Sequence, residues 1–333
     1  MQKEFKERKA VKSSSKKYLL VNYMKSKGTI LVLILLLIYC TIAFGATFFS
    51  WSNISNIFRQ ISWFGIAAIG VNLCILAGGR DVSVGANAMF TGMVFAYLVS
   101  VMQLNILLSL LITLCIGPVI GLVNGFIVNK LRLNAMIATL TISWILQSFA
   151  LLLYNNNTIP IRSTDRIDRV FALSRGDLFG IIPIPFAIFI LLVWVFDIFA
   201  RRTKTGRAIY AVGGDTESAG MMGVNVERTR MITHLICSIL ACISGLFLIG
   251  RTGLGDPTSC STWGFTMMSV VVIGGTRMHG GIGDIRGVIV GVLIYGLINN
   301  MLSLYAVTKY WQELITGLIM LIAVLSQEKA ALQ

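Results

Sequence analysis

Long apolar segments alternate with short polar ones along most of this chain. Runs of about 20 apolar residues, the length that a helix needs to cross the hydrocarbon core of a membrane, recur from residue 28 onward. The runs contain glycine and proline and lack a strict alternation of polar and apolar positions, which favours helices over a transmembrane β-barrel. The pattern therefore predicts an all-α membrane protein that folds as a polytopic helix bundle.

About ten transmembrane helices are expected from the positions of these runs. Their approximate ranges are 28–49, 61–77, 86–102, 104–128, 135–154, 184–199, 231–249, 263–275, 288–304 and 310–325. They divide the chain into a basic tail at 1–27, a transmembrane domain at 28–326 and a short tail at 327–333. An even number of crossings places both termini on the same side of the membrane.

The charged residues indicate which side that is. Only 13% of the residues are charged, against roughly 25% in soluble domains. The formal net charge is nevertheless +14, and nine Lys or Arg residues but only two Glu residues precede the first span. Cytoplasmic segments of membrane proteins carry such an excess of Lys and Arg. We therefore expect both termini in the cytoplasm, and a lipid bilayer rather than a nucleic acid as the partner of this basic chain.

Motifs of enzymes and nucleotide-binding proteins are missing from the sequence. It contains no Gly-Lys dipeptide, hence no P-loop, and no H-E-x-x-H or G-x-S-x-G pattern. The six cysteines form no C-x-x-C pair, so neither a zinc site nor a disulfide framework is indicated. The sequence predicts no catalytic residue, no metal site and no cofactor bound by this chain.

The longest polar interruption in the second half, within 201–230, contains an E-x-A-x3-G pattern. Its members are Glu217, Ala219 and Gly223. A short helix is expected here, with Asp215 or Thr216 as N-cap, Glu217 in the first turn and Gly223 at its end. Such a pattern resembles the cytoplasmic coupling loop of ABC-importer permeases, in which a short helix docks into a groove on the ATPase subunit. An amphipathic loop helix without a partner is the alternative.

An ordered set of further motifs, spread over about residues 60–326, resembles the ribose-type permease family. The matching segments are 78–85 (GGRDVSVG), 134–140, 206–224, 272–276, the glycines at 280, 281, 283, 287 and 291, Asn299-Asn300, and 310–312 with Gly317. The sequence departs from the family pattern at Arg80, where an apolar residue is usual, and in the basic turn that contains Arg277, His279 and Arg286.

The resemblance implies a membrane-spanning subunit of an ATP-driven importer in the bacterial cytoplasmic (inner) membrane. It would import a sugar or a similar small polar solute that an extracytoplasmic substrate-binding protein delivers. Its partners would be an ATPase subunit, which uses ATP and Mg, and a second permease subunit, identical or a sibling. The residues that would couple it to the ATPase are Gly213, Gly214, Glu217, Ala219 and Gly223.

Polar residues at or near membrane depth are candidates for the substrate pathway. They are Asp81, Ser83, Asn299, Asn300 and Gln312. A buried ionisable group is costly and marks a functional site by default, and Arg80 is a possible partner of Asp81. Two interpretations stay open for Asp81, a role in the pathway or an N-cap of the third helix that binds the Val84 amide. The amides either contact sugar hydroxyls or join helices.

The polar segment 155–180 is expected outside the cell, where it would contact the delivery protein or form a plain solvated loop. The candidate contact residues are Arg162, Arg166, Arg169 and Arg175. An ion-coupled secondary transporter is the alternative function, but it would need several intramembrane carboxylates, and the sequence offers Asp81 and Asp197. His234, one of two histidines, lies in an apolar span and is interpreted as a packed residue. The particular solute cannot be read from the sequence.

Overall fold

The computed structural model describes residues 29–162, 165–308, 310–318 and 321. Within them, eight helices are long and apolar enough to cross a membrane. They are Thr29–Thr47, α2 (Trp51–Leu76), α3 with the π-helical turn that continues it (Val84–Val101), α4 (Ile106–Asn129), α5 (Ala135–Leu153), α7 (Ile184–Arg202), α10 (Val226–Thr252) and α12 (Gly287–Leu304). The predicted all-α, multi-pass architecture is confirmed, whereas the number ten stays a prediction.

Shorter elements connect these helices. They are α6 (Asp165–Arg175), α8 (Lys204–Gly214), α9 (Thr216–Met221) and α11 (Trp263–Ile273). Two antiparallel pairs of two-residue strands join β1 (Ile159–Pro160) to β4 (Leu254–Gly255) and β2 (Asp177–Leu178) to β3 (Ile182–Pro183). Residues 310–318 are helical as expected, while both predicted tails lie outside the described residues.

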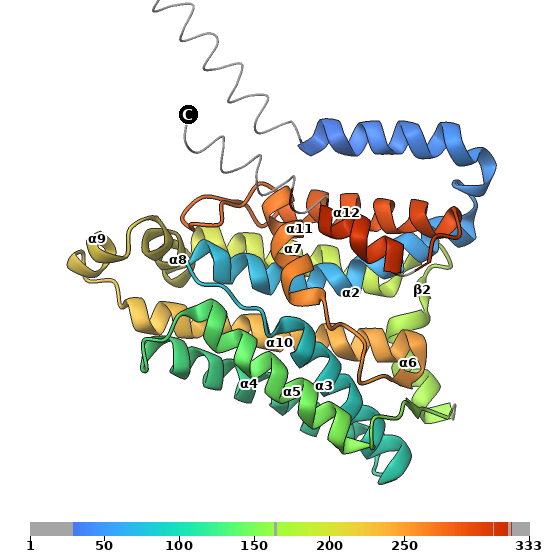
Figure 1. Ribbon diagram of the computed structural model, residues 1–333, viewed down its shortest axis with the longest axis horizontal. Coiled ribbons are helices and arrows are strands. Elements are labelled where there is room, and N and C mark those ends of the chain that lie inside the picture. Colours follow the sequence, from blue (N-terminus) through green and yellow to red (C-terminus); the bar gives the residue numbers. More distant parts are fainter. Residues whose placement is uncertain (1–28, 163–164, 309, 319–320, 322–333) are drawn as a thin grey trace, which may run out of the picture.

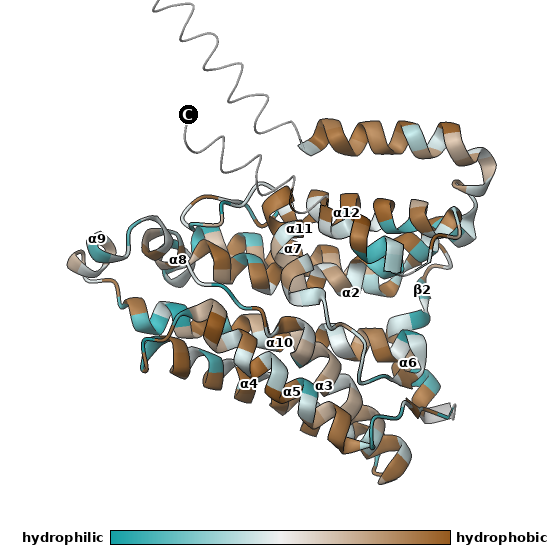
Figure 2. Ribbon diagram, in the orientation of Figure 1, coloured by the Kyte–Doolittle hydropathy of each residue, from teal (hydrophilic) through white to brown (hydrophobic). Residues whose placement is uncertain are grey.

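The bundle is built around α10, which packs against α2, α3 and α4 (Figure 1). Helices α8 and α9 lie at one end of the molecule, and α6 with the β2–β3 pair lies at the other. Hydrophobic residues cover the middle of the long helices, and hydrophilic residues gather mainly toward these two ends (Figure 2). The two long polar segments of the sequence therefore lie at opposite ends, as the alternation of spans predicts.

Burial separates core helices from peripheral ones. In its most apolar window α2 is 83% buried, whereas the helix Thr29–Thr47 is 6% buried and lies apart from the bundle in Figure 1. Helices α4, α5 and α7 are intermediate and expose large apolar side chains. Because lipid tails are as apolar as these side chains, such surfaces suit a protein surrounded by a bilayer.

The second span begins ten residues earlier than the sequence pattern predicted, at Trp51 instead of 61. Polar side chains mark residues 52–60 as a loop in the sequence, but several of them have distant partners. Asn53 pairs with Asn300, and Arg59 forms an ion pair with Asp177 at 2.8 Å. These long-range contacts extend the helix, and periodicity cannot reveal them.

The helix within the predicted eighth span, 263–275, is too short to cross a membrane by itself. Helix α11 has 11 residues, about 16 Å at 1.5 Å per residue, half of the ~30 Å hydrocarbon core. Its first residue, Trp263, stacks on Trp63 in the middle of α2 with ring centroids 4.9 Å apart. Helix α11 thus begins inside the bundle, which is typical of the broken helices of transporters.

Candidate functional site

Helix α9 has the local structure that the coupling pattern predicts. The Asp215 carboxylate caps it, accepting hydrogen bonds from the amides of Glu217 and Ser218 at 3.0 Å each. These bonds, the Ser218 amide first, hold the pKa of the Asp215 carboxyl below its usual value. Gly223 follows the helix with φ +83°, a left-handed conformation that glycine adopts without strain.

One face of this loop is anchored and the other is exposed. Ala219 is buried, and Arg230 of α10 donates to the Thr216 hydroxyl at 3.0 Å. Met221 and Met222 are 82% and 74% exposed, and the surface around Gly220 is open. Two neighbouring exposed methionines form an adaptable apolar surface of the kind found at protein interfaces. The projecting helix is therefore free to dock on a partner.

A junction of backbones joins α8 to the core. A Cβ atom at Gly213 would overlap the Leu76 carbonyl oxygen and lie 2.6 Å from the Gly281 nitrogen. Gly281 itself donates to Leu76 O at 3.0 Å. We call this contact of Leu76, Gly213 and Gly281 the glycine junction. It places the end of α8 against both glycine-rich stretches of the sequence, 78–85 and 274–287, which are in mutual contact.

The break between α2 and α3 surrounds a fully buried carboxylate. Asp81 is 0% exposed, and its Oδ1 accepts from the Ser83 amide at 2.9 Å and the Ser83 hydroxyl at 2.6 Å. The Asn124 amide of α4 donates to Ser83 Oγ at 2.7 Å. The Val82 amide donates to Thr139 of α5 at 3.1 Å. Protein groups therefore satisfy the backbone freed by the break, as membrane depth requires.

Two expectations about Asp81 are corrected. Its partner across the bundle is His234 of α10, with Nδ1 3.3 Å from Asp81 Oδ2, and among the described residues no ion pair joins it to Arg80. The carboxylate forms a local turn with Ser83 instead of capping α3 through the Val84 amide. An aspartate two residues before an amide reaches it readily, whereas the half-buried Arg80 has no hydrogen-bond partner at its Nε atom.

The same pocket contains the one group of side chains that could hold a metal ion among the described residues. Ligand atoms of Cys74, Asp81 and Cys237 lie within 4.8 Å of one another. Thiolates and a carboxylate can bind zinc, but the Asp81 oxygens already accept bonds from Ser83 and lie beside His234. The absence of a metal site stays a prediction.

The amide candidates lie far from Asp81. Asn300 and Asn53 exchange hydrogen bonds of 2.6 and 3.3 Å near the start of α2, whereas Asp81 follows its end, about 35 Å away along the helix. Asn299 donates to Tyr295 O, one turn earlier, and Gln312 to Val307 O. The structure thus does not bring the five candidate pathway residues into one site, and Asn300 joins two helices.

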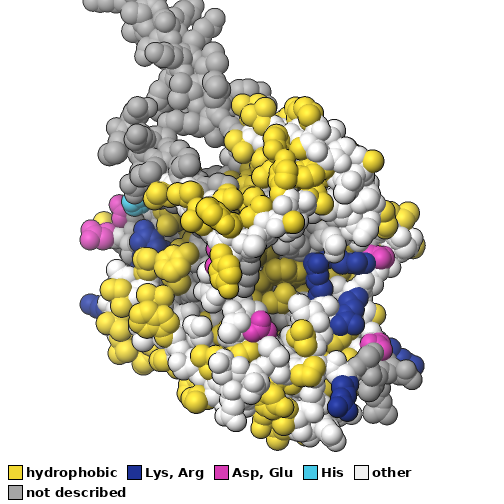
Figure 3. Space-filling model, turned by 45° about the vertical axis from the view of Figure 1, so that its right-hand side comes forward, with side chains coloured by type: hydrophobic (Ala, Val, Ile, Leu, Met, Phe, Trp, Pro, Cys, Tyr) yellow, Lys and Arg dark blue, Asp and Glu magenta, His cyan; other side chains and the backbone are white. Residues whose placement is uncertain are grey.

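The arginines of the opposite end lie on or beside α6. Arg162 and Arg169 are exposed, Arg175 donates to Gly250 O at 2.7 Å, and the side chain of Arg166 is outside the described part. Lys and Arg side chains with nearby Asp and Glu gather on one part of this surface (Figure 3). The surface has mixed charge as expected, and contact with a delivery protein stays a prediction.

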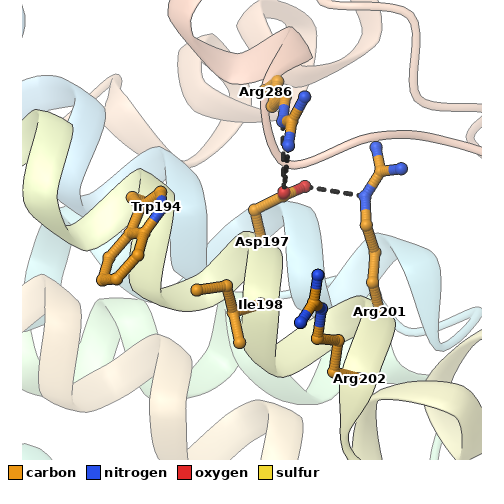
Figure 4. Close-up of a pocket in the computed structure, with 6 residues that line it drawn as sticks. All are labelled: Trp194, Asp197, Ile198, Arg201, Arg202 and Arg286. Atoms are coloured by element: carbon orange, nitrogen blue, oxygen red, sulfur yellow. Dashed lines mark hydrogen bonds and ion pairs between the residues drawn. The ribbon is translucent and has the colours of Figure 1, made fainter.

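Asp197, the other carboxylate noted in the sequence, lies near the α8 end of α7. Arg201 and Arg286 both bond to it at 2.8 Å (Figure 4), and Arg201 also reaches Asp284 at 2.7 Å. The network ties the end of α7 to the loop before α12. Asp197 is therefore neutralised by cations, unlike the free carboxylates that an ion-coupled transporter uses.

Sequence reasoning missed His234 and Asn72. Asn72 of α2 accepts from Thr276 at 2.8 Å and donates to Asp284 O at 3.1 Å, which secures the second glycine-rich stretch. The signal for His234 was present in the sequence: a buried imidazole needs a hydrogen-bond partner, and Asp81 was the carboxylate expected at depth. No local pattern pointed to Asn72.

A polytopic bundle with membrane-embedded breaks and a projecting loop at one end defines an α-helical membrane transport protein. The model of the family described as branched-chain amino acid transport system / permease component matches residues 53–324. The chain is 33% identical over 309 residues to the ribose import permease protein of Escherichia coli (strain K12), covering 92% of this chain and 94% of that protein.

Two further relatives extend this result. Identity to the ribose import permease protein of Bacillus subtilis (strain 168) is 31%, covering 92% of this chain and 94% of the relative. Identity to the L-arabinose transport system permease protein of Escherichia coli (strain K12) is 30%, covering 90% and 89%. No solved structure matches the chain significantly. The chain belongs to this permease family, which confirms the resemblance and the multi-pass membrane localisation predicted from the sequence.

Proposed function

We propose that this chain is the membrane-spanning permease subunit of an ATP-driven importer of a sugar. The observation that supports this most directly is the glycine junction, where the predicted ATPase-coupling loop rests on the break beside Asp81. The substrate class rests on the relatives, whose names specify ribose and L-arabinose. The broader family name refers to branched-chain amino acids, so a small polar solute is the wider class.

The geometry suggests how movement of a partner would reach the membrane domain. An ATPase subunit that binds ATP and Mg would hold α9 through its exposed face. A shift of α9 moves α8, and α8 meets Leu76 and Gly281 through backbone atoms that cannot rotate away. The end of α2 and the loop before α12 would therefore move with the ATPase. This transmits force without any nucleotide site in the permease.

The remaining parts of the importer follow from the same proposal. A binding protein would deliver the sugar to the end that carries α6, and a second permease subunit, identical or a sibling, would complete the pathway. Because the delivery protein would supply the affinity, the permease needs only weak contacts with its substrate. This is consistent with the separated positions of Asp81, Asn299 and Asn300 in the fold.

The coupling role is tested by Glu217→Lys and Gly223→Arg. The first places a cation at the positive end of α9, and the second puts a large side chain at φ +83° on an open surface. We expect ATP-dependent uptake to fall at least about tenfold, corresponding to a loss of ~1.4 kcal/mol or more of coupling. Uptake and co-purification of the ATPase are measured in the same membranes.

Arg228→Gln is the matched control, because this exposed residue lies in the first turn of α10, a few residues after α9, and makes no ion pair among the described side chains. It should transport nearly normally. Wild-type uptake and normal ATPase co-purification in both α9 variants would contradict the coupling assignment.

Orientation is tested by labelling a single cysteine at Arg169, an exposed position on α6. In a background without the six native cysteines, Arg169→Cys should react with an impermeant thiol reagent added to intact spheroplasts. A cysteine at Met221 of α9 should react only after the membrane is permeabilised. The reverse pattern would invert the topology and exclude binding-protein contact at α6.

One observation favours ion coupling as a second candidate function: the buried contact of Asp81 with His234, a pairing found in proton relays. Proteoliposomes that contain this chain alone distinguish the two. Sugar uptake driven by a proton gradient without ATPase or binding protein would favour the secondary transporter. Uptake that needs both partners and ATP would favour the importer.

A further inference from the structure

A cavity of about 420 Å³ lies beside the last turns of α7, at the end of that helix that leads into α8 (Figure 4). We call it the α7 pocket, and its lining residues are Trp194, Asp197, Ile198, Arg201, Arg202 and Arg286. It neither overlaps the buried Asp81 cluster nor belongs to the glycine junction. Three arginines line this one cavity, and two of them, Arg201 and Arg202, stand in the last turn of a membrane span.

The pocket carries excess positive charge. Its single carboxylate, Asp197, is shared by Arg201 and Arg286, and Arg201 also meets Asp284 at the rim. Within the described residues, the guanidinium of Arg202 makes no ion pair with any of these groups, and it lies between Ile198 and Arg201, below Asp197, in Figure 4. An anion can therefore bind there without displacing an existing partner.

An apolar stripe leads from this charge into the membrane. Trp194, Ile198 and Arg202 follow one another at intervals of four residues, so they lie on one face of α7. Trp194 is 61% exposed and Leu191 beside it 56% exposed. A tryptophan below a cluster of arginines at the end of a span is typical of the membrane interface, where headgroups meet acyl chains.

We propose that the α7 pocket binds the headgroup phosphate of an anionic phospholipid, with an acyl chain along Leu191, Trp194 and Ile198. Arginine binds phosphate oxygens through two parallel hydrogen bonds. Basic pockets between helices on the cytoplasmic side bind anionic lipids in the same way. The excess positive charge opposes the ammonium group of a zwitterionic lipid, which makes phosphatidylglycerol or cardiolipin the expected class.

A lipid in the α7 pocket would also affect the loop that precedes α12. Arg286 immediately precedes α12, and Arg201 reaches Asp284 in the loop that contains Gly281. A bound phosphate would hold these arginines together and join the end of α7 to the loop that supports α8. The lipid would therefore stabilise the structural connection between the spans and the α8–α9 loop, whichever solute is carried.

The test measures lipid binding to the full chain, purified in detergent. Native mass spectrometry and thermal unfolding are followed while phosphatidylglycerol or phosphatidylcholine is added. The wild type should retain phosphatidylglycerol in preference to phosphatidylcholine and gain thermal stability from it. Arg202→Gln should weaken phosphatidylglycerol binding about tenfold, the effect expected from losing a charge-assisted contact, and Arg202→Lys should recover part of it.

Two controls separate the lipid from other sources of phosphate and from general charge effects. Arg132→Gln removes one positive charge from the exposed turn between α4 and α5 and should leave the binding unchanged. Trp194→Ala should weaken phosphatidylglycerol binding without changing the response to inorganic phosphate. Unfolding temperatures without added lipid show that each variant is folded.

Three results would overturn the proposal. The first is equal binding of phosphatidylglycerol and phosphatidylcholine by the wild type. The second is an equal effect of Arg202→Gln and Arg132→Gln. The third is stabilisation by inorganic phosphate as large as that by phosphatidylglycerol, which would identify a free-anion site instead of a lipid site.

Discussion

Gly213→Ala should abolish most of the transport activity. Gly214 was predicted as a coupling residue too, but Gly214→Ala should leave transport nearly unchanged because a methyl group there meets open space. A methyl group at 213 would overlap the Leu76 carbonyl oxygen and crowd the Gly281 nitrogen at 2.6 Å, while nothing lies within 4 Å of a methyl group at 214. Backbone atoms cannot rotate away as side chains do, so the glycine junction must open. Overpacking of this kind costs about 1–3 kcal/mol.

Because the junction connects α8 to α2 and to the loop before α12, its opening should uncouple ATP hydrolysis from uptake. We expect at least about a tenfold fall in ATP-dependent uptake for Gly213→Ala, and uptake within about twofold of the wild type for Gly214→Ala. Both variants are measured at equal amounts of membrane-inserted protein. Equal uptake by the two variants would show that the junction does not transmit the movement.

Features that depend only on neighbouring residues could be predicted from the sequence. Apolar runs predict the spans because lipid offers no hydrogen bonds to the backbone, so each run must be helical. Asp215 or Thr216 was predicted as the cap and Gly223 as the helix end, because both features act within a few residues of their own position, and Asp215 is the cap that forms. All three features are found in the structure.

Interactions between distant residues account for the differences. The start of α2 depends on Asn300 and Asp177, more than 100 residues away. The pairing of Asp81 with His234 joins residues 153 positions apart, so the adjacent Arg80 was the partner that sequence reasoning favoured. Helix α11 has the composition of a span, but its length decides that it crosses only half of the membrane.

The two glycine-rich stretches, 78–85 and 274–287, also show that local features can be predicted from the sequence whereas contacts between distant residues cannot. Both stretches are visible in the sequence by their glycines, but their contact with each other is not. In the structure Gly280 lies against Gly78, so a Cβ there would be 2.8 Å from the Gly78 nitrogen. Glycines at both positions allow two loops, separated by about 200 residues of sequence, to pack through their backbones. The break beside Asp81 is therefore stabilised by a loop that lies about 200 residues later in the sequence.

Asp81→Asn should sharply reduce uptake at unchanged expression. The substitution keeps the shape of the side chain and an oxygen that can accept from Ser83, but it removes the charge that faces His234. When His234 is protonated, the two side chains form a buried ion pair, and removing one partner of such a pair typically costs about 3–5 kcal/mol because the other charge is left uncompensated. A role limited to the local turn with Ser83 would survive the change, since the amide oxygen replaces the carboxylate oxygen there.

A double-mutant cycle with His234→Gln measures the interaction between Asp81 and His234 separately from the effect of each residue alone. If Asp81 acts through His234, the double variant should lose little more activity than either single variant, with a coupling of about 0.5–3 kcal/mol between the sites. Uptake and the unfolding temperature are measured for all four proteins. The comparison is Asn124→Ala, which removes the 2.7 Å donor to Ser83 and a longer 3.4 Å donor to Asp81 but leaves the Asp81 charge and His234 in place. Near-normal uptake by Asp81→Asn would assign the carboxylate to the local turn, and strictly additive losses would show that His234 acts separately.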